Sequence, residues 1–250
     1  MSLRNVLLTS KVGRRTKIPL QRTLGRIGYE LVPRRLSEDQ LVRELIGRHG
    51  VTMLIDVGAN QGQYARRFRD QGFQGKILSF EPIADAFALL ARAAKSDELW
   101  ETRQLALDRY VGRGLLNVSA NSVSSSLLTM EKLHEEAEPT SRVVRSEEVS
   151  ISTLDAELGA STETKLWMKL DVQGGEMRVL DGGAGVISRC QVIQCEVSLR
   201  PLYRGQPSYL DVLNRLDVEG LYPVFVIPGF SDRESGEMYQ LDVIAARAAV

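Results

Sequence analysis

The chain has 250 residues, of which 43% are hydrophobic and 26% are charged, and its 32 basic residues balance its 32 acidic ones. This zero net charge argues against a protein that binds nucleic acid along its whole surface, because such binding rests on neutralised phosphates. No uninterrupted apolar stretch reaches the ~18 residues needed to span a bilayer, and the N-terminus lacks the apolar core of a secretory signal. We expect a cytoplasmic protein.

The first 35 residues are strongly basic, with nine basic residues against the single acid Glu30. Their net charge is therefore +8, and residues 36–250 carry −8. We interpret residues 1–37 as a solvated basic arm that precedes one domain of residues 38–250. A second interpretation is that the arm makes peripheral contact with an anionic membrane or with a phosphate-bearing substrate.

From residue 38 onward the pattern alternates between helices and strands. Apolar residues at helical spacing predict helices over 38–50, 64–72 and 84–94, and short apolar runs predict strands over 52–57 and 76–80. A strand, a helix and a second strand in succession favour parallel pairing with a right-handed crossover. The first half of the chain therefore indicates an α/β sheet.

The middle of the chain interrupts this alternation. We expect strands over 99–107 and 115–118, a polar loop over 121–126 and a charged surface segment over 131–148. The loop is interpreted either as a lid that faces a substrate or as a plain connection. Alternation then resumes in expected elements at 149–153, 165–170, 175–180, 191–197, 209–216, 221–227 and 239–246.

The two cysteines and two histidines are not spaced for a zinc site. Cys190 and Cys195 lie five residues apart in one expected strand, so their side chains point to opposite faces and should not pair. His134 lies in the charged segment, and we expect it to be solvated at the surface.

The expected parallel strands end in acidic residues, which are Asp56, Glu81, Asp108, Asp171 and Glu196. In open α/β sheets a ligand lies beyond the carboxyl ends of the strands, near the switch in strand order. These five acids are therefore candidate site residues.

The loop after the first strand favours a nucleotide-type cofactor. Gly58 and Gly62 allow a tight turn and a close backbone approach to a ligand. Glu81 follows Asp56 by 25 residues and is placed to accept hydrogen bonds from ribose hydroxyls. A dinucleotide fingerprint requires G-x-G-x-x-G, whereas this loop has G-x-x-x-G. The pattern fits S-adenosylmethionine better, because that cofactor has no pyrophosphate to hold.

The chain resembles the FkbM family of S-adenosylmethionine-dependent methyltransferases from about residue 50 to residue 245. The segments that carry the resemblance are DVGANQGQY at 56–64, FEP at 80–82, NSVSSSL at 121–127, TLD at 153–155, KLDVQGGE at 169–176 and VLDG at 179–182. One departure is Gln173, where the family often has glutamate.

The resemblance implies a Rossmann-like class I methyltransferase fold of the α/β class, with a mostly parallel seven-stranded sheet and helices on both faces. It also implies S-adenosylmethionine as the cofactor. The cofactor-binding residues that we infer from the motifs are Asp56, Gly58, Asn60, Gly62, Tyr64, Glu81 and Asp108. The glycine loop would hold the amino-acid end of the cofactor, Glu81 would hold its ribose, and Asp108 would approach its adenine.

Methyl transfer to a hydroxyl benefits from a nearby base, which typically contributes ~10²–10⁴ in rate. Asp171 is the first candidate for this base, and Glu176 and Glu196 are the other candidate catalytic residues. Helix capping is the alternative role for Asp171 and Glu196. The same two carboxylates could hold Mg²⁺. We do not favour a metal, because the asparagine expected beside the second acid is Val197.

The resulting interpretation is an S-adenosylmethionine-dependent O-methyltransferase that acts on a hydroxyl of a glycolipid or of a glycosylated natural product. The alternative is a non-catalytic nucleotide-binding module of the same fold. A dinucleotide-dependent oxidoreductase is disfavoured by the missing glycine. We expect a small-molecule or glycolipid substrate and no nucleic-acid partner, because the domain is acidic and lacks an Asn/Asp-Pro-Pro-aromatic motif.

Overall fold

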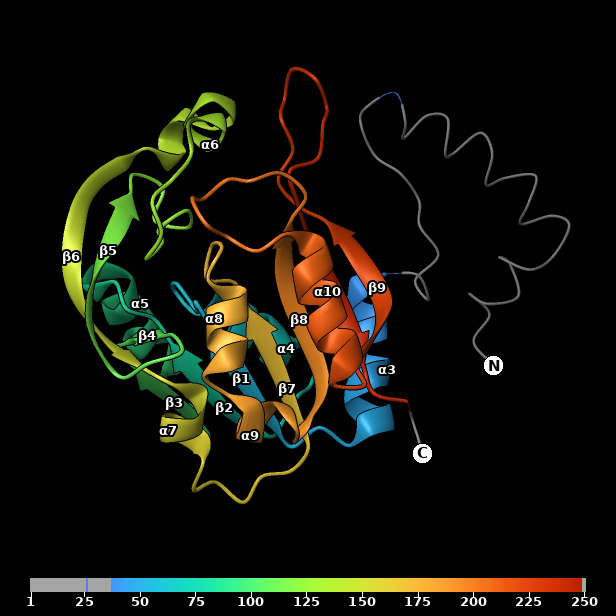
Figure 1. The fold of residues 1–250 in the computed structure, drawn as a ribbon. Helices are drawn as coiled ribbons and strands as arrows, with labels where there is room; N and C mark the ends of the chain where they lie inside the picture. The colour runs from blue at the N-terminus through green and yellow to red at the C-terminus, as the bar shows by residue number, and fades with distance from the viewer. Residues whose placement is uncertain (1–25, 27–36, 249–250) are drawn as a thin grey trace, which may run out of the picture. The chain divides into compact units, whose positions relative to one another are not determined.

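The structure is a computed structural model that describes Arg26 and residues 37–248 (Figure 1). The expected basic arm, residues 1–37, therefore lies outside the described residues apart from Arg26 and Ser37. The chain divides into two units, residues 1–42 and 43–250, and the strands of both sheets belong to the second.

The elements alternate along much of the chain, as expected. The strands are β1 (Met53–Val57), β2 (Lys76–Phe80), β3 (Trp100–Arg103), β4 (Ala106–Leu107), β5 (Gly112–Ser119), β6 (Val143–Ser152), β7 (Leu166–Leu170), β8 (Cys190–Ser198), β9 (Tyr222–Pro228) and β10 (Gln240–Ala246). The helices are α3 (Glu38–His49), α4 (Gln63–Asp70), α5 (Ala84–Ala94), α6 (Lys132–Ala137), α7 (Leu154–Leu158), α8 (Glu176–Asp181), α9 (Ala184–Ile187) and α10 (Tyr209–Val218).

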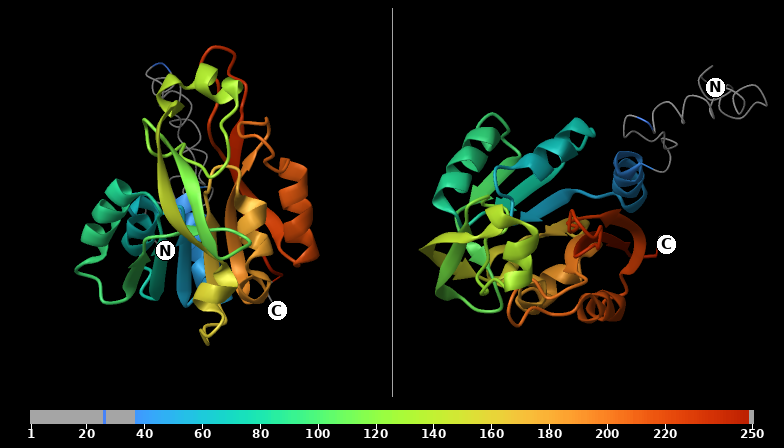
Figure 2. Two further views of the ribbon diagram at one scale, coloured as in Figure 1. Left: turned by 60° about the vertical axis from the view of Figure 1, so that its left-hand side comes forward. Right: turned by 90° about the horizontal axis from the view of Figure 1, so that it is seen from above.

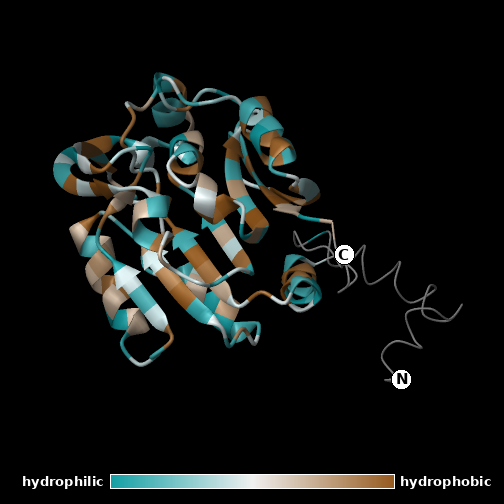
Figure 3. Ribbon diagram, turned by 60° about the horizontal axis from the view of Figure 1, so that its bottom comes forward, coloured by the Kyte–Doolittle hydropathy of each residue, from teal (hydrophilic) through white to brown (hydrophobic). Residues whose placement is uncertain are grey.

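Within the described residues, seven strands form a large sheet in the order β3-β2-β1-β7-β8-β10-β9. The first five strands of this order are parallel, and β10 is antiparallel to both of its neighbours, β8 and β9. Strands β1 and β7 are buried along their whole length, which is typical of parallel strands that are covered on both faces. The inner strands are correspondingly rich in hydrophobic residues (Figure 3). This topology confirms the expected mostly parallel seven-stranded sheet.

Helices cover both faces of the large sheet, as the right-hand view of Figure 2 shows. Helices α8, α9 and α10 pack on one face, where their apolar residues join those of β1, β7 and β8 in the principal core. Helices α4 and α5 lie on the other face. There the Phe68 ring of α4 packs edge-on against Trp167 of β7, with ring centroids 5.1 Å apart.

A small sheet in the order β4-β6-β5 stands beside the large one. The prediction of one strand over 99–107 is therefore wrong. This segment forms two strands, β3 in the large sheet and β4 in the small one. The chain changes sheets because Ala106 and Leu107 pair with Ile151 and Ser152 of β6 instead of continuing along β2. Strand β6 begins at Val143, so the expected surface segment 131–148 also contains structured elements.

Among the described residues, both cysteines are buried and form no disulfide. Both belong to the principal core, instead of the opposite faces that their spacing predicted, because the register of β8 shifts near its start. No helix in this part of the chain is long and apolar enough to cross a bilayer.

Phe68 tests how α4 is anchored on the sheet. The side chain is 1% exposed and packs against three rings, those of Tyr64, Phe73 and Trp167. We expect Phe68→Ala to lower the free energy of unfolding by about 3–5 kcal/mol, because the substitution leaves a cavity under α4. Urea unfolding followed by circular dichroism measures this change. The control Leu89→Ala, at a side chain that is 42% exposed, should cost less than about 1 kcal/mol. Equal effects of the two substitutions would contradict a role of Phe68 in anchoring α4.

Candidate active site

A cavity that is open to solvent lies at the carboxyl edge of the large sheet, between that edge and the small sheet. It is lined by the loops that follow β1, β2 and β7, by residues 105–108, by the serine-rich segment 122–128 and by Arg178 of α8. The charged residues in its lining are Glu81, Asp108, Asp171 and Arg178. Three of the five strand-end acids therefore line this cavity: Glu81 and Asp171 follow strands of the large sheet, and Asp108 follows β4 of the small sheet.

The glycine loop is held tightly against the neighbouring strand. Gly58 has a φ of 76°, and a Cβ atom at this position would collide with the backbone carbonyl of Asp171. Both the positive φ and the close approach require glycine. Asn60 also has a positive φ, of 48°, and its side chain donates a hydrogen bond to Ser122 Oγ at 3.1 Å. The loop therefore connects β1 with the serine-rich segment across the cavity.

Glu81, which follows β2, lines the cavity and binds the backbone on both sides of it. Its Oε2 accepts a hydrogen bond from the Asn60 backbone N–H at 2.8 Å, and its Oε1 accepts one from the Ile83 N–H at 2.9 Å. Burial raises the pKa of Glu81 to about 7, although these two backbone bonds oppose the rise. The carboxyl group that was predicted to hold ribose thus also shapes the glycine loop.

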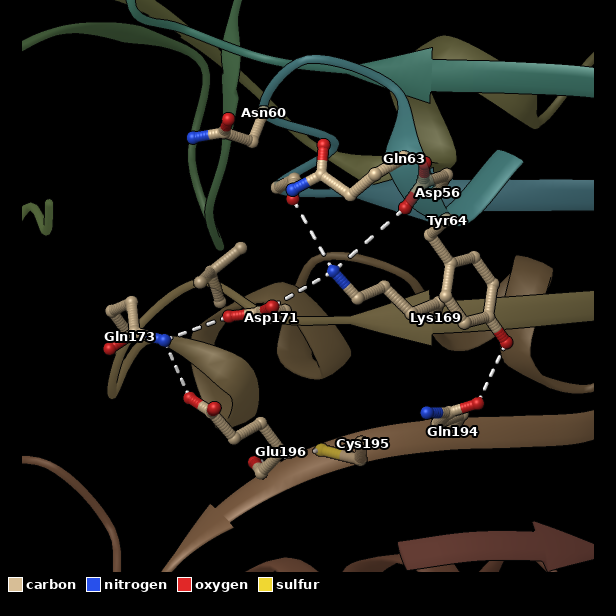
Figure 4. Close-up of polar contacts among 12 residues, drawn as sticks. Asp56, Asn60, Gln63, Tyr64, Lys169, Asp171, Gln173, Gln194, Cys195 and Glu196 are labelled. Carbon is tan, nitrogen blue, oxygen red and sulfur yellow. Dashed lines mark hydrogen bonds and ion pairs between the residues drawn. The ribbon is translucent and has the colours of Figure 1, made fainter. Parts of the chain in front are cut away.

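Lys169 provides the central positive charge of the site, as Figure 4 shows. Its Nζ lies 2.9 Å from Asp171 Oδ2, 3.4 Å from the Gly58 carbonyl oxygen and 4.0 Å from Asp56 Oδ1. Burial alone would lower the pKa of Lys169, but the charges of Asp171 and Asp56 more than offset this and raise it. Lys169 therefore holds Asp171 in position as an ion pair.

Asp171 is the carboxylate with the best access to the cavity. Its side chain is 33% exposed, whereas Glu81 and Asp108 are buried. Asp171 does not cap α8: its oxygens accept hydrogen bonds from Lys169 and from Gln173 instead. Glu176, the first residue of α8, binds the preceding loop instead, since its Oε1 accepts hydrogen bonds from the backbone N–H groups of Val172 and Gly174 at 3.1 and 3.2 Å.

Two of the three candidate catalytic acids do not line the cavity. Burial raises the pKa of Glu176 to about 7, and its carboxyl group faces backbone amides. Glu196 Oε2 accepts hydrogen bonds from Gln173 Nε2 at 2.6 Å and from Gln240 Nε2 at 2.7 Å. The catalytic roles of Glu176 and Glu196 stay predictions for two residues outside the cavity lining, and Glu196 contacts that lining through Gln173.

Gln173 separates the two carboxylates that were considered as Mg²⁺ ligands. Its Nε2 lies 2.8 Å from Asp171 Oδ1 and 2.6 Å from Glu196 Oε2, so an amide group occupies the space between them. The part of the chain that the structure describes contains no group of three or more histidine, cysteine or acidic side chains arranged to hold a metal ion.

Asp108 forms part of the cavity wall, but Arg178 engages both of its oxygens. Arg178 Nε lies 3.0 Å from Asp108 Oδ1, and its terminal nitrogen lies 2.9 Å from Oδ2. Such a two-point ion pair fixes both side chains in one plane. The predicted approach of Asp108 to an adenine therefore involves an already paired carboxylate.

Asp56, Gly62 and Tyr64 are near the cavity but do not line it. Asp56 lies under the glycine loop, and its oxygens have no hydrogen-bond partner among the described residues. Burial raises its pKa to about 6, and the charge of Lys169 opposes this rise. The Tyr64 hydroxyl donates to Gln194 at 2.7 Å and accepts from Trp167 at 3.0 Å. The cofactor contact of Tyr64 stays a prediction, for a hydroxyl that already bonds to side chains of β7 and β8.

His134 is buried rather than solvated, which corrects the expectation from sequence. Its ring lies between Tyr203 and Phe230, with centroid distances of 5.3 and 5.4 Å. Burial lowers its pKa to about 4, although the nearby Glu138 opposes this shift. The surrounding apolar cluster joins α6 to the loop that follows β8, so His134 is part of the structure above the sheet edge.

Sequence reasoning missed three side chains that organise the site: Lys169, Gln173 and Arg178. Lys169 carried a detectable signal, because a lysine within the apolar run LWMKL must find a buried partner. Gln173 was visible only as a departure from a family pattern. Arg178 gave no signal, since its partner Asp108 lies 70 residues away in the sequence.

The strand order, the glycine loop and the acid-lined cavity together define a class I methyltransferase fold. Residues 56–221 match the family model of the methyltransferase FkbM domain, and the chain belongs to this family. The expectation from the sequence motifs is thereby confirmed.

Similar proteins include the 2-O-methyltransferase NoeI of Sinorhizobium fredii (strain NBRC 101917 / NGR234). It is 27% identical over 184 residues, which cover 68% of this chain and 74% of NoeI. The METTL16 MTase domain shares 11% identity and a TM-score of 0.46, covering 94% of this chain and 78% of its own. A TehB-like SAM-dependent methyltransferase from Corynebacterium glutamicum ATCC 13032 shares 10% identity and a TM-score of 0.42, covering 96% of this chain and all of its own.

The burial of His134 predicts a specific loss of stability in acid. Between pH 6.5, the ordinary pKa of histidine, and about pH 4 the unfolded chain binds a proton that the folded chain does not. The free energy of unfolding should therefore decrease as the pH falls through this window. Urea unfolding at several pH values should show a steeper decrease for the wild type than for His134→Gln, whose side chain does not titrate. Identical pH dependences for the two proteins would contradict the buried, neutral histidine.

Proposed function

We propose that this protein is an S-adenosylmethionine-dependent O-methyltransferase whose acceptor is a sugar hydroxyl of a glycolipid or of a glycosylated natural product. The observation that carries the proposal is the position of Asp171. It is the most exposed of the three acids in the cavity lining, and it lies on the loop that packs directly against Gly58. A cofactor loop and a proton acceptor therefore share one cavity.

The charge of the cavity supports this cofactor. Three acids and one arginine line it; Asp108 pairs with that arginine, Arg178, and Asp171 pairs with Lys169. The excess of carboxyl groups over basic groups suits a ligand with positively charged sulfonium and ammonium groups, whereas a pyrophosphate would be repelled. The buried Asp56 carboxyl group beneath the loop adds to the negative potential. Gly58 and Asn60 would hold the amino-acid end of the cofactor, and Glu81 would hold its ribose.

Asp171 provides the chemistry that the chain itself contributes. S-adenosylmethionine supplies an electrophilic methyl group when it is bound. Asp171 accepts the proton of the acceptor hydroxyl, and this makes the oxygen a better nucleophile for the methyl carbon. Lys169 and Gln173 each hold one oxygen of Asp171, so the carboxylate keeps one orientation toward the cavity. A fixed orientation raises the rate because in-line transfer depends on alignment.

The choice of acceptor rests on the family and on the relative NoeI, which is named a 2-O-methyltransferase. The test is incubation of the protein with isotopically labelled S-adenosylmethionine and a glycolipid extract, followed by mass spectrometry. The proposal is supported if a lipid gains the label and the label stays with the sugar when that sugar is cleaved from the lipid. Label that appears only in protein or nucleic acid, offered in parallel, would overturn the proposed acceptor class.

Glu81→Gln tests the cofactor site. We expect it to weaken binding of S-adenosylhomocysteine by roughly tenfold to a hundredfold, since hydrogen bonds to a charged group contribute about 1.5–3 kcal/mol. Isothermal titration calorimetry measures the dissociation constant directly. The control Glu101→Gln, at an exposed side chain of β3, should bind as the wild type does. Unchanged binding by Glu81→Gln would place the cofactor elsewhere.

Asp171→Asn separates catalysis from binding. The asparagine oxygen can still accept a hydrogen bond from Lys169, but the amide cannot take up the acceptor proton. We expect methyl transfer to fall by ~10²–10⁴, while S-adenosylhomocysteine binding changes by less than about threefold. The control Asp181→Asn, at the end of α8 where Asp181 pairs with Arg215, should keep its activity. Undiminished turnover by Asp171→Asn would remove Asp171 as the base.

A further inference from the structure

Gln173 occupies an unusual position for a glutamine. Its backbone is left-handed, with a φ of 54°, a conformation that costs a residue with a side chain ~1 kcal/mol or more. The residue is 7% exposed. Its carbonyl oxygen accepts a hydrogen bond from Ser126 Oγ at 2.7 Å, which ties the serine-rich segment to the loop after β7. The strained backbone is thus held by surrounding structure.

All polar atoms of the Gln173 side chain are engaged. Nε2 donates to Asp171 Oδ1 at 2.8 Å and to Glu196 Oε2 at 2.6 Å. Oε1 lies 2.8 Å from the hydroxyl of Tyr203, a residue that is 1% exposed. The amide orientation follows from the charges around it, because the NH₂ group faces two carboxylate groups and the oxygen faces a hydroxyl. Figure 4 shows Gln173 between Asp171 and Glu196.

The Gln173 amide lies between two carboxyl groups, those of Asp171 and Glu196, that would otherwise repel each other. Two carboxyl groups that approach a common point must share a proton, bind a cation or receive hydrogen-bond donors. Gln173 supplies two N–H donors at that point, and Gln240 supplies one more to Glu196. The charged groups that face this arrangement are Lys169 of β7, Glu176 of α8 and Asp242 of β10. A neutral donor at position 173 therefore lets the two carboxyl groups stay close together without an added charge.

We propose that Gln173 is a positioning residue for methyl transfer, and that its amide takes the place of a divalent cation between Asp171 and Glu196. The inference rests on the function proposed above in one respect only, that Asp171 is the base. Gln173 fixes the direction of the Asp171 carboxylate and, through Tyr203 and Ser126, couples it to the segments that cover the cavity.

The decisive substitution is Gln173→Glu, which keeps the shape of the side chain but replaces the donor with a third carboxyl group. Three carboxylates with one common centre form a set of oxygen ligands suited to Mg²⁺ or Mn²⁺. Without a cation the variant must retain a proton at this centre. We therefore expect its melting temperature, relative to the wild type, to fall from about pH 6 to about pH 8.

Added MnCl₂ should reverse that loss. We expect saturating Mn²⁺ to raise the melting temperature of Gln173→Glu at about pH 8 by roughly 5–10 °C, and calorimetry should show stoichiometric binding. The wild type and the control Gln74→Glu, an exposed residue before β2, should show neither effect. A folded Gln173→Glu variant that binds no Mn²⁺ and has the pH dependence of the wild type would overturn the proposal. Binding of Mn²⁺ by the wild type at the same affinity would also overturn it.

The positioning role of Gln173 is tested by measuring kcat and cofactor binding separately. Gln173→Ala should lower kcat by roughly tenfold to a hundredfold, while the dissociation constant of S-adenosylhomocysteine changes by less than about threefold. Gln173→Glu should be slow in chelator and should regain activity with Mg²⁺. Wild-type rates for both variants would contradict the positioning role. If the wild type itself transfers no methyl group, the proposed function fails, whereas the melting and Mn²⁺ measurements still decide what Gln173 does.

Discussion

The arrangement of the site depends on one buried ammonium group, that of Lys169. Several carboxyl groups at one sheet edge repel one another and lose hydration, which costs free energy in a partly buried setting. Lys169 Nζ lies within 4.0 Å of both Asp56 and Asp171 and offsets part of that cost. The parallel register of the large sheet places Lys169 directly beside Asp56, so this contact is built by strand pairing. Removing the lysine would leave two carboxyl groups without a cation.

Three contacts between distant segments of the chain hold the walls of the cavity together. Asn60 reaches Ser122, Ser126 reaches the Gln173 backbone, and the Tyr203 hydroxyl lies between Gln173 and the carbonyl oxygen of Ser124. Each contact joins residues that are dozens of positions apart. The serine-rich segment thus forms a wall of the cavity, which favours the interpretation of residues 122–126 as a cover over an interpretation as a plain loop.

Much of the fold follows from local patterns. The runs over β1 and β7 are continuous and apolar because both faces of these strands are buried, and the alternation with helices favours parallel pairing. The division of residues 99–107 between two sheets was not predictable, because β4 is only two residues long and its partner β6 lies more than 40 residues further along the chain. The burial of His134 was not predictable for a similar reason. Its neighbours in the sequence are charged, and the rings that bury it, Tyr203 and Phe230, lie far along the chain.

The amino-acid sequence by itself determined the strand–helix alternation, the glycine loop and the placement of acids at strand ends, because each of these is a property of a short segment. Only the tertiary structure decided what those acids do. Asp171 lines the cavity, Glu176 binds backbone amides of the loop before α8, and Asp108 pairs with Arg178, because the direction and the partners of each side chain depend on how the chain folds around it. Charges interact through space, so their roles are set by the neighbours that folding brings within a few ångströms.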